Sequence, residues 1–225
     1  RREIGIPLER ITTVANGVDV AQFRPDAAAR ALTRARLGIA QDAPLLVASG
    51  RLEREKGFAT AIEALALTRR QWPDARLLIA GSGSDAARLD ALARPLGGAV
   101  QLVGHVPRAE LGALLAAGDL YLMPSLCFEG LSLAVLEALA CGLPVLATAG
   151  GGAAALRDGV TGLILPAQDA PAWAAAIEGL LANERKRRAL GALARQVASA
   201  QYSQEQMVAA TETIMAWVIR SRAAE

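Results

Sequence analysis

Two cations in a short segment bounded by glycines are the first residues with an evident chemical use. The segment Gly50-Arg51-Leu52-Glu53-Arg54-Glu55-Lys56-Gly57 lies between a predicted strand and a predicted helix. A diphosphate is bound well by the planar guanidinium of Arg51, which makes two parallel hydrogen bonds, and by the compact ammonium of Lys56. The competing interpretation is a solvated loop in which these cations pair with Glu53 and Glu55.

Two acids, Glu129 and Glu137, flank the predicted start of a helix that follows another strand. If this helix begins just after Gly130, free backbone amides attract an anion there. These amides belong to Gly130, Leu131, Ser132 and Leu133. Glu137 lies about two turns into an otherwise apolar helix, where a carboxylate is costly unless it is paired. Either the hydroxyl groups of a bound ribose or a buried partner such as an arginine would satisfy it.

Three further features carry weaker signals. The segment 81–86, Gly-Ser-Gly-Ser-Asp-Ala, matches a dinucleotide-binding fingerprint, but the next strand ends in Gly104-His105 without an acid for a ribose. We therefore favour a turn between a strand and a helix. The triple glycine 150–152 could line a phosphate or sugar pocket or merely turn the chain. His105 lies at a strand end, but a lone histidine is more often a packing residue than a catalytic one.

The composition excludes several classes of protein. The chain has 225 residues, 53% of them hydrophobic, which excludes intrinsic disorder. Its net charge of +2 is too small to argue for nucleic-acid binding. Two cysteines and one histidine suggest neither a disulfide framework nor a zinc site, and we expect no metal and no cofactor. The chain opens without methionine, so we expect either a natural protein that begins upstream or an excised domain.

Short apolar segments alternate with longer amphipathic ones. Apolar segments without polar alternation are typical of parallel strands covered on both faces. Their alternation with helices predicts a doubly wound, Rossmann-like α/β fold, in which ligands bind beyond the carboxyl ends of the strands. We predict strands at Ile11–Ala15, Leu45–Ser49, Arg76–Ala80, Val100–Val103, Leu120–Met123, Pro144–Thr148 and Leu163–Leu165. We predict helices at Phe58–Gln71, Asp85–Arg94, Arg108–Ala117, Leu131–Ala140, Ala170–Ala182, Glu184–Ser199 and Gln204–Arg220.

The last three predicted helices have no strands between them and are expected to form a C-terminal addition to a single domain over residues 1–225. The basic run 184–188 could touch an anionic membrane surface, although a solvated helix face is the simpler interpretation. No apolar run reaches the roughly 18 residues that span a bilayer. We expect a cytoplasmic protein, with peripheral contact at the inner face of the membrane as an option.

At Glu129 and Glu137 the chain resembles the retaining GT-B glycosyltransferases of group 1, or family four. The acids are spaced as E-x7-E after Pro124-Ser125, and Ala-Cys-Gly-Leu-Pro-Val follows at 140–145. Similar segments, in the order of that family, extend over nearly the whole chain: 14–19, 23–25, 50–57, 78–83, 103–106 and 158–162. The chain departs from the family's pattern at 151–155, which lacks the usual Pro and Glu, and at Ser132, where glycine is common.

This resemblance implies a fold that is one half of GT-B and a donor-binding role for the chain. The donor would be UDP-, GDP- or another nucleoside-diphosphate sugar, whose sugar is transferred with retention of configuration. Arg51 and Lys56 would hold the diphosphate. Glu137 would bind the ribose, and Glu129 would contact the transferred sugar near the reacting centre.

The same resemblance implies that the amides of residues 130–133 support the phosphate or sugar, and that the backbone of His105 and Val106 borders the base. The helix over residues 203–225 would pack toward an absent N-terminal domain that binds a saccharide or lipid-linked acceptor, in polysaccharide or glycolipid synthesis. This chain alone is therefore expected to be inactive or weakly active.

Two alternatives are kept beside this interpretation. One is a module that binds a sugar nucleotide without catalysis, which the missing Pro and Glu at 151–155 favour. The other is a glycoside hydrolase that uses Glu129 and Glu137 as its acid and nucleophile. The latter needs carboxyl groups roughly 5 to 9.5 Å apart around a sugar cleft.

Overall fold

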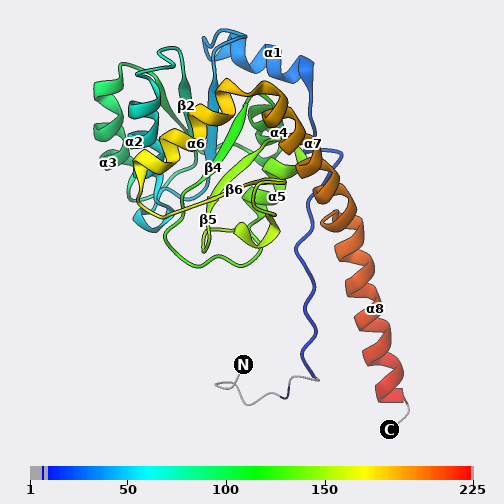
Figure 1. Cartoon of the computed structure of the whole chain (residues 1–225). Coiled ribbons are helices and arrows are strands. Elements are labelled where there is room, and N and C mark those ends of the chain that lie inside the picture. Colours follow the sequence, from blue (N-terminus) through cyan, green and yellow to red (C-terminus); the bar gives the residue numbers. More distant parts are fainter. Residues whose placement is uncertain (1–6, 8–9, 224–225) are drawn as a thin grey trace.

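A six-stranded parallel sheet forms the centre of the computed structural model, which describes residues 7 and 10–223 of the chain (Figure 1). The strand order is β3-β2-β1-β4-β5-β6. The strands are β1 (Leu45–Ser49), β2 (Arg76–Ala80), β3 (Val100–Gly104), β4 (Leu120–Met123), β5 (Val145–Thr148) and β6 (Gly162–Leu165). Every residue of β1, β4 and β5 is buried, as expected for central strands covered on both faces. The predicted Rossmann-like fold class is confirmed.

Helices cover both faces of the sheet, each over its own apolar core. The core on one face takes side chains from α4 (Arg108–Ala116), α5 (Leu133–Ala140) and α7 (Glu184–Gln201), and α1 (Ala27–Arg36) packs against α4. The other core takes side chains from α2 (Phe58–Thr68), α3 (Ala86–Ala93) and α6 (Ala170–Ala182). Short 3-10 turns stand at η2 (Arg54–Lys56), η3 (Arg94–Leu96) and η4 (Ala153–Ala155).

The predicted strand Ile11–Ala15 is wrong. Residues 11–17 form no strand, and Val18 instead makes a single bridge to Ser203. Figure 1 shows this segment leaving the sheet layers instead of joining them. Its apolar residues resemble a strand in sequence, but the segment does not reach an edge of the sheet at which it could pair.

The helix α1 was not predicted from the sequence. Asp26 caps it by accepting a hydrogen bond from the amide of Ala29 at 2.8 Å. The helix is tied to the sheet by Arg34, which is fully buried, donates to the carbonyl of Ala117 at 2.9 Å and pairs with Asp119 at 2.8 Å. A buried arginine looks like a solvated one in sequence, so the polarity of this segment hid its helical character.

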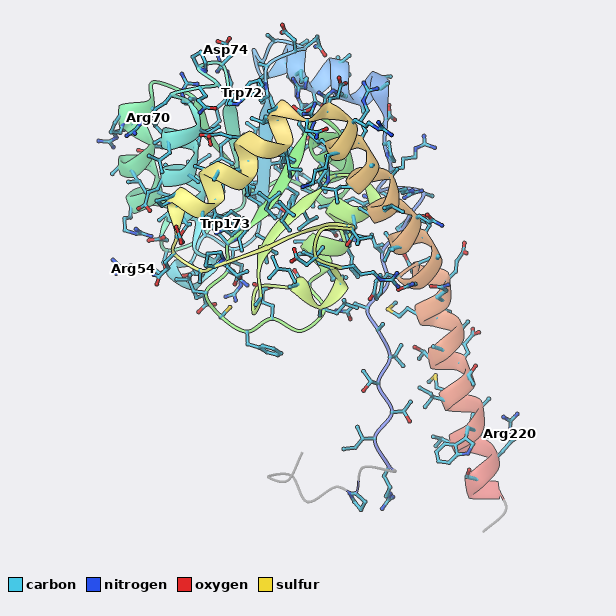
Figure 2. The ribbon with its side chains drawn as sticks, viewed as in Figure 1. Arg54, Arg70, Trp72, Asp74, Trp173 and Arg220 are labelled. Carbon is cyan, nitrogen blue, oxygen red and sulfur yellow. The ribbon has the colours of Figure 1, made fainter. Side chains whose placement is uncertain are left out.

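The helix α8 (Gln204–Ala223) extends away from the domain on the side where the strands end (Figures 1 and 2). In Figure 2, Arg220 lies far along this helix, Arg54 marks the edge where strands end, and Trp72 marks the opposite edge. Apolar side chains of α8 stay exposed, among them Trp217 and Ile219. Within the described residues, no helix combines the length and hydropathy needed to cross a bilayer.

Candidate functional site

The carboxyl ends of the central strands enclose a cavity at the point where the strand order reverses. The chain leaves β1 toward β2 on one side, and β4 lies on the other side; in open α/β sheets this reversal point is where ligands bind. The cavity has a volume of about 340 Å³. Its lining residues are Ser49, Gly50, Arg51, Ala80, Gly81, Ser82, His105, Val106, Leu111, Leu133, Ala134 and Glu137.

Five of the ten predicted site residues line this cavity: Arg51, His105, Val106, Leu133 and Glu137. Arg51 is 70% exposed and pairs at 3.3 Å with Glu55, which is also exposed. The alternative interpretation, a solvated loop in which these cations pair with nearby glutamates, thus holds for Arg51. An exposed ion pair of this kind contributes little to stability, so the guanidinium can still turn toward an anion. The other five residues lie outside the lining.

Glu137 is the buried acid of the cavity. Its side chain is 5% exposed and accepts a hydrogen bond from Nη1 of Arg108 at 2.5 Å. Burial raises the pKa of Glu137, and the positive charge of Arg108 acts in the opposite direction. Of the two partners that the sequence left open, the structure supplies the arginine. Arg108 was missed because, at the first position of a predicted helix, it looks like an ordinary surface residue.

A second pair of opposite charges lies beside the cavity. Nζ of Lys56 donates to Oε1 of Glu129 at 2.8 Å, and these side chains are only 13% and 16% exposed. Lys56 belongs to η2 after β1, whereas Glu129 lies in the loop after β4. The backbone of Glu129 is fixed from the other side, because its amide donates to the carbonyl of Gly150 at 2.7 Å. The triple glycine therefore positions Glu129.

The loops after β1 and β4 approach so closely at Gly57 that no side chain fits there. A Cβ atom added to Gly57 would lie 2.0 Å from the carbonyl oxygen of Pro124, and the residue has a φ of +66°. A backbone hydrogen bond of 2.7 Å, from Leu126 to Glu55, joins the same two loops. Gly57 thus sets the distance across which Lys56 reaches Glu129.

The helix α5 begins two residues later than predicted. Its first residue is Leu133 and Ser132 is its cap, so Gly130 and Leu131 lie in the preceding turn. The amides without a helical partner are those of the first turn, which starts at Leu133. Ser132 makes no side-chain capping bond. The free amides at the start of α5 therefore lie at the cavity, where they can attract an anion. The prediction that the helix begins just after Gly130, so that the amides of Gly130 and Leu131 belong to its first turn, is wrong.

The segment 81–86 behaves as a packing turn. Gly81 has a φ of +145°, and a Cβ there would lie 1.8 Å from the carbonyl oxygen of Gly50. A Cβ on Gly83 would lie 2.4 Å from the carbonyl oxygen of Leu52. These glycines let the loop after β2 lie against the loop after β1, which shapes one wall of the cavity. Within the part of the chain that the structure describes, no group of three acids, cysteines or histidines could hold a metal ion.

Comparison with known proteins gives consistent matches. Residues 12–197 match the family described as "Glycosyl transferases group 1". The chain is 39% identical over 188 residues to the GDP-mannose-dependent alpha-(1-6)-phosphatidylinositol monomannoside mannosyltransferase of Mycolicibacterium smegmatis, a match that covers 80% of this chain and 49% of that protein. The chain thus spans about half the length of this curated relative.

Two solved structures share the fold. Sucrose-phosphate synthase from Thermosynechococcus elongatus is 31% identical with a TM-score of 0.83, and the match covers 92% of this chain and 52% of that one. HepE from Anabaena, solved in complex with UDP, is 23% identical with a TM-score of 0.84, and the match covers 96% of this chain and 60% of that one. At 23% identity, the similarity to HepE is evidence for the fold alone.

The close approach at Gly57 leads to a prediction about stability. Gly38 has nearly the same φ, +65°, but no atom within 4 Å of an added Cβ. Gly38→Ala should therefore cost only the backbone strain of about 1–2 kcal/mol, whereas Gly57→Ala should cost clearly more, because Pro124 must also move. Denaturant unfolding of both variants measures the difference, and an equal loss would contradict the tight packing of the two loops.

The burial of Glu137 leads to a prediction about pH. Because its pKa is raised in the folded chain, the native state holds this proton to a higher pH than the unfolded state. Its contribution to stability is therefore complete at acid pH and is lost as the pH rises through the native pKa. The free energy of unfolding of the wild type, minus that of Glu137→Gln, should fall as the pH rises above about 4.3, the ordinary pKa of a glutamate in an unfolded chain. A flat or rising difference in urea titrations would contradict this reasoning.

Proposed function

The chain belongs to the group 1 glycosyl transferases, and from that premise we propose that it is the half of such an enzyme that binds a nucleoside-diphosphate sugar. The observation that carries this proposal is the cavity where Arg51, the start of α5 and Glu137 meet. A cation and free helix amides suit a diphosphate, and an acceptor-only carboxylate suits the hydroxyl groups of a ribose. The backbone of His105 and Val106 would then border the base.

The chemistry follows from where charge develops. Transfer of the sugar leaves negative charge on the departing diphosphate, and fixed cations and amides stabilise that charge without having to reorganise. Arg51 lines the cavity, and Lys56 stands beside it in its pair with Glu129. We place Glu129 against the transferred sugar, where its pairing with Lys56 would join the sugar end of the site to the phosphate end. Transfer would proceed with retention and without a metal.

The donor and acceptor are proposed from the relatives. The mycobacterial relative is named as GDP-mannose-dependent and acts on a phosphatidylinositol monomannoside, and HepE was solved with UDP. We therefore propose a GDP- or UDP-sugar donor and an acceptor in glycolipid or polysaccharide synthesis. The acceptor would bind an N-terminal half that faces the carboxyl edge of the sheet, with α8 packing against it. This chain alone would have little activity, and the whole enzyme would work in the cytoplasm, at the membrane where its acceptor is a lipid.

The hydrolase alternative finds no support in the arrangement of the acids. Glu137 lines the cavity and pairs with Arg108, whereas Glu129 lies outside the lining and pairs with Lys56. The two carboxylates thus belong to different groups of side chains. The non-catalytic module shares the donor site with the proposed enzyme, so it differs only in whether transfer follows binding.

Donor binding is tested by the thermal stability of the chain with UDP, GDP and ADP. A nucleoside diphosphate at a hundredfold excess over its Kd should stabilise the fold by about 2.7 kcal/mol, which raises the Tm by several degrees. Arg51→Ala and Glu137→Ala should remove the shift. Arg94→Ala is the matched control, because Arg94 is an exposed arginine that pairs with Asp90 away from the cavity. If none of the three nucleotides raises the Tm, the proposal of donor binding is wrong.

The role of Glu129 is tested by comparing two ligands. Calorimetry with GDP and GDP-mannose, or with UDP and UDP-glucose, gives the extra affinity that the sugar contributes. Glu129→Gln should lower that extra affinity by about tenfold, the worth of one hydrogen bond to a charged group, and leave binding of the bare diphosphate nearly unchanged. If Glu129→Gln weakens binding of both ligands equally, Glu129 does not contact the sugar and serves only as a structural partner of Lys56.

A further inference from the structure

Arg108 is the one charged partner of Glu137 among the described residues, and it reaches this acid from a different element. Arg108 opens α4, whereas Glu137 lies within α5, and their ion pair bridges the two helices at 2.5 Å. Only the acid is buried, since the side chain of Arg108 is 55% exposed. The orientation of the Glu137 carboxylate therefore depends on its hydrogen bond to Arg108.

The place of Arg108 is itself determined by a third element. Its guanidinium carbon lies 5.1 Å from the ring centroid of Phe23, a fully buried side chain, in a cation–π contact. Its backbone carbonyl accepts a hydrogen bond from the side chain of Gln22 at 2.6 Å. Phe23 is fixed in turn by Arg195 of α7, which donates to its carbonyl at 2.7 Å and to that of Ala140, at the end of α5, at 2.8 Å. Arg195 thus holds both Phe23, over which Arg108 lies, and the end of the helix that carries Glu137.

From this arrangement we propose that Arg108 is a positioning residue for donor binding, which holds the carboxylate of Glu137 in the direction that faces the cavity. The inference rests on the proposed function, because it concerns the acid assigned there to the ribose. Arg108 is not among the cavity-lining residues, so it acts through Glu137 and not on the ligand. One carboxylate oxygen accepts from Arg108, which leaves the other for hydroxyl groups of the ligand.

The same contact governs the protonation of the acid. Burial favours the neutral carboxyl, which has fewer acceptor sites for a ribose, and Arg108 opposes this by favouring the charged form. Other titratable groups near Glu137 are Arg51 and His105, which line the same cavity, Tyr121 of β4, and Cys141 at the end of its own helix. From α7, which packs against this helix, Arg195 reaches the carbonyl of Ala140. Burial raises the pKa of both Tyr121 and Cys141, so these two groups stay neutral at physiological pH.

The test is calorimetric titration of the chain with GDP and with UDP between pH 5 and pH 8.5. Arg108→Ala should weaken binding about tenfold at pH 7, as expected for a hydrogen bond to a charged group. It should also move the pH at which binding falls to half upward by about one unit or more, since a neighbouring cation lowers a carboxyl pKa by that much. Arg108→Lys keeps the positive charge, so its pH of half-maximal binding should lie close to that of the wild type. Arg94→Ala is the control and should bind as the wild type does.

A double-mutant cycle with Glu137→Gln separates positioning from direct contact. Once Glu137 is an amide, Arg108→Ala should change the affinity less than twofold and should not move the pH at which binding falls to half. The proposal is overturned if Arg108→Ala binds like the wild type at every pH, or if it weakens binding equally in the Glu137→Gln background. If the wild type binds neither nucleotide at any pH, the proposed function fails first and this inference falls with it.

Discussion

A carboxylate buried at the mouth of a parallel sheet needs a cation beside it, and much of the site follows from that requirement. Glu137 lies in the apolar helix α5 and is matched by Arg108 of α4. Because a buried charge without a partner is costly, this pair joins the two helices where the cavity opens. The contact of Arg108 with Phe23 extends the same constraint to the segment that enters the domain before α1. One pair of charges therefore connects three parts of the chain that are distant in sequence.

The site has two parts that meet at the reversal of strand order. In the function that we propose, the cavity with Arg51 and Glu137 would take the nucleoside diphosphate, and the pair of Lys56 and Glu129 would take the sugar that it carries. Glycine makes their proximity feasible, because at Gly57 the loop after β1 nearly touches the loop after β4. Backbone contact between these loops, and not a side chain, thus sets the spacing of the two parts.

Strand positions were predictable because a strand buried on both faces is continuously apolar. The segments of β1, β2 and β4 agree with the prediction residue for residue. The same rule failed at 11–15, where an apolar segment has no sheet edge to join, and polarity hid α1, whose Arg34 is buried. Helix starts were less certain than strands, because the first residue of α5 depends on the turn that precedes it, and there the sequence pattern differs from the structure by two residues.

By itself the sequence determined the fold class, the sheet edge at which to look for a site, and five of the twelve residues that line the cavity there, because apolar patterning and chemical type are properties of single segments. Only the tertiary structure decided which charges meet: Lys56 with Glu129, and Glu137 with Arg108. These partners are 73 and 29 residues apart in the chain. The physical reason is that an ion pair depends on the packing distance between elements, and that distance is set by core side chains and close-packed glycines far from the charges themselves.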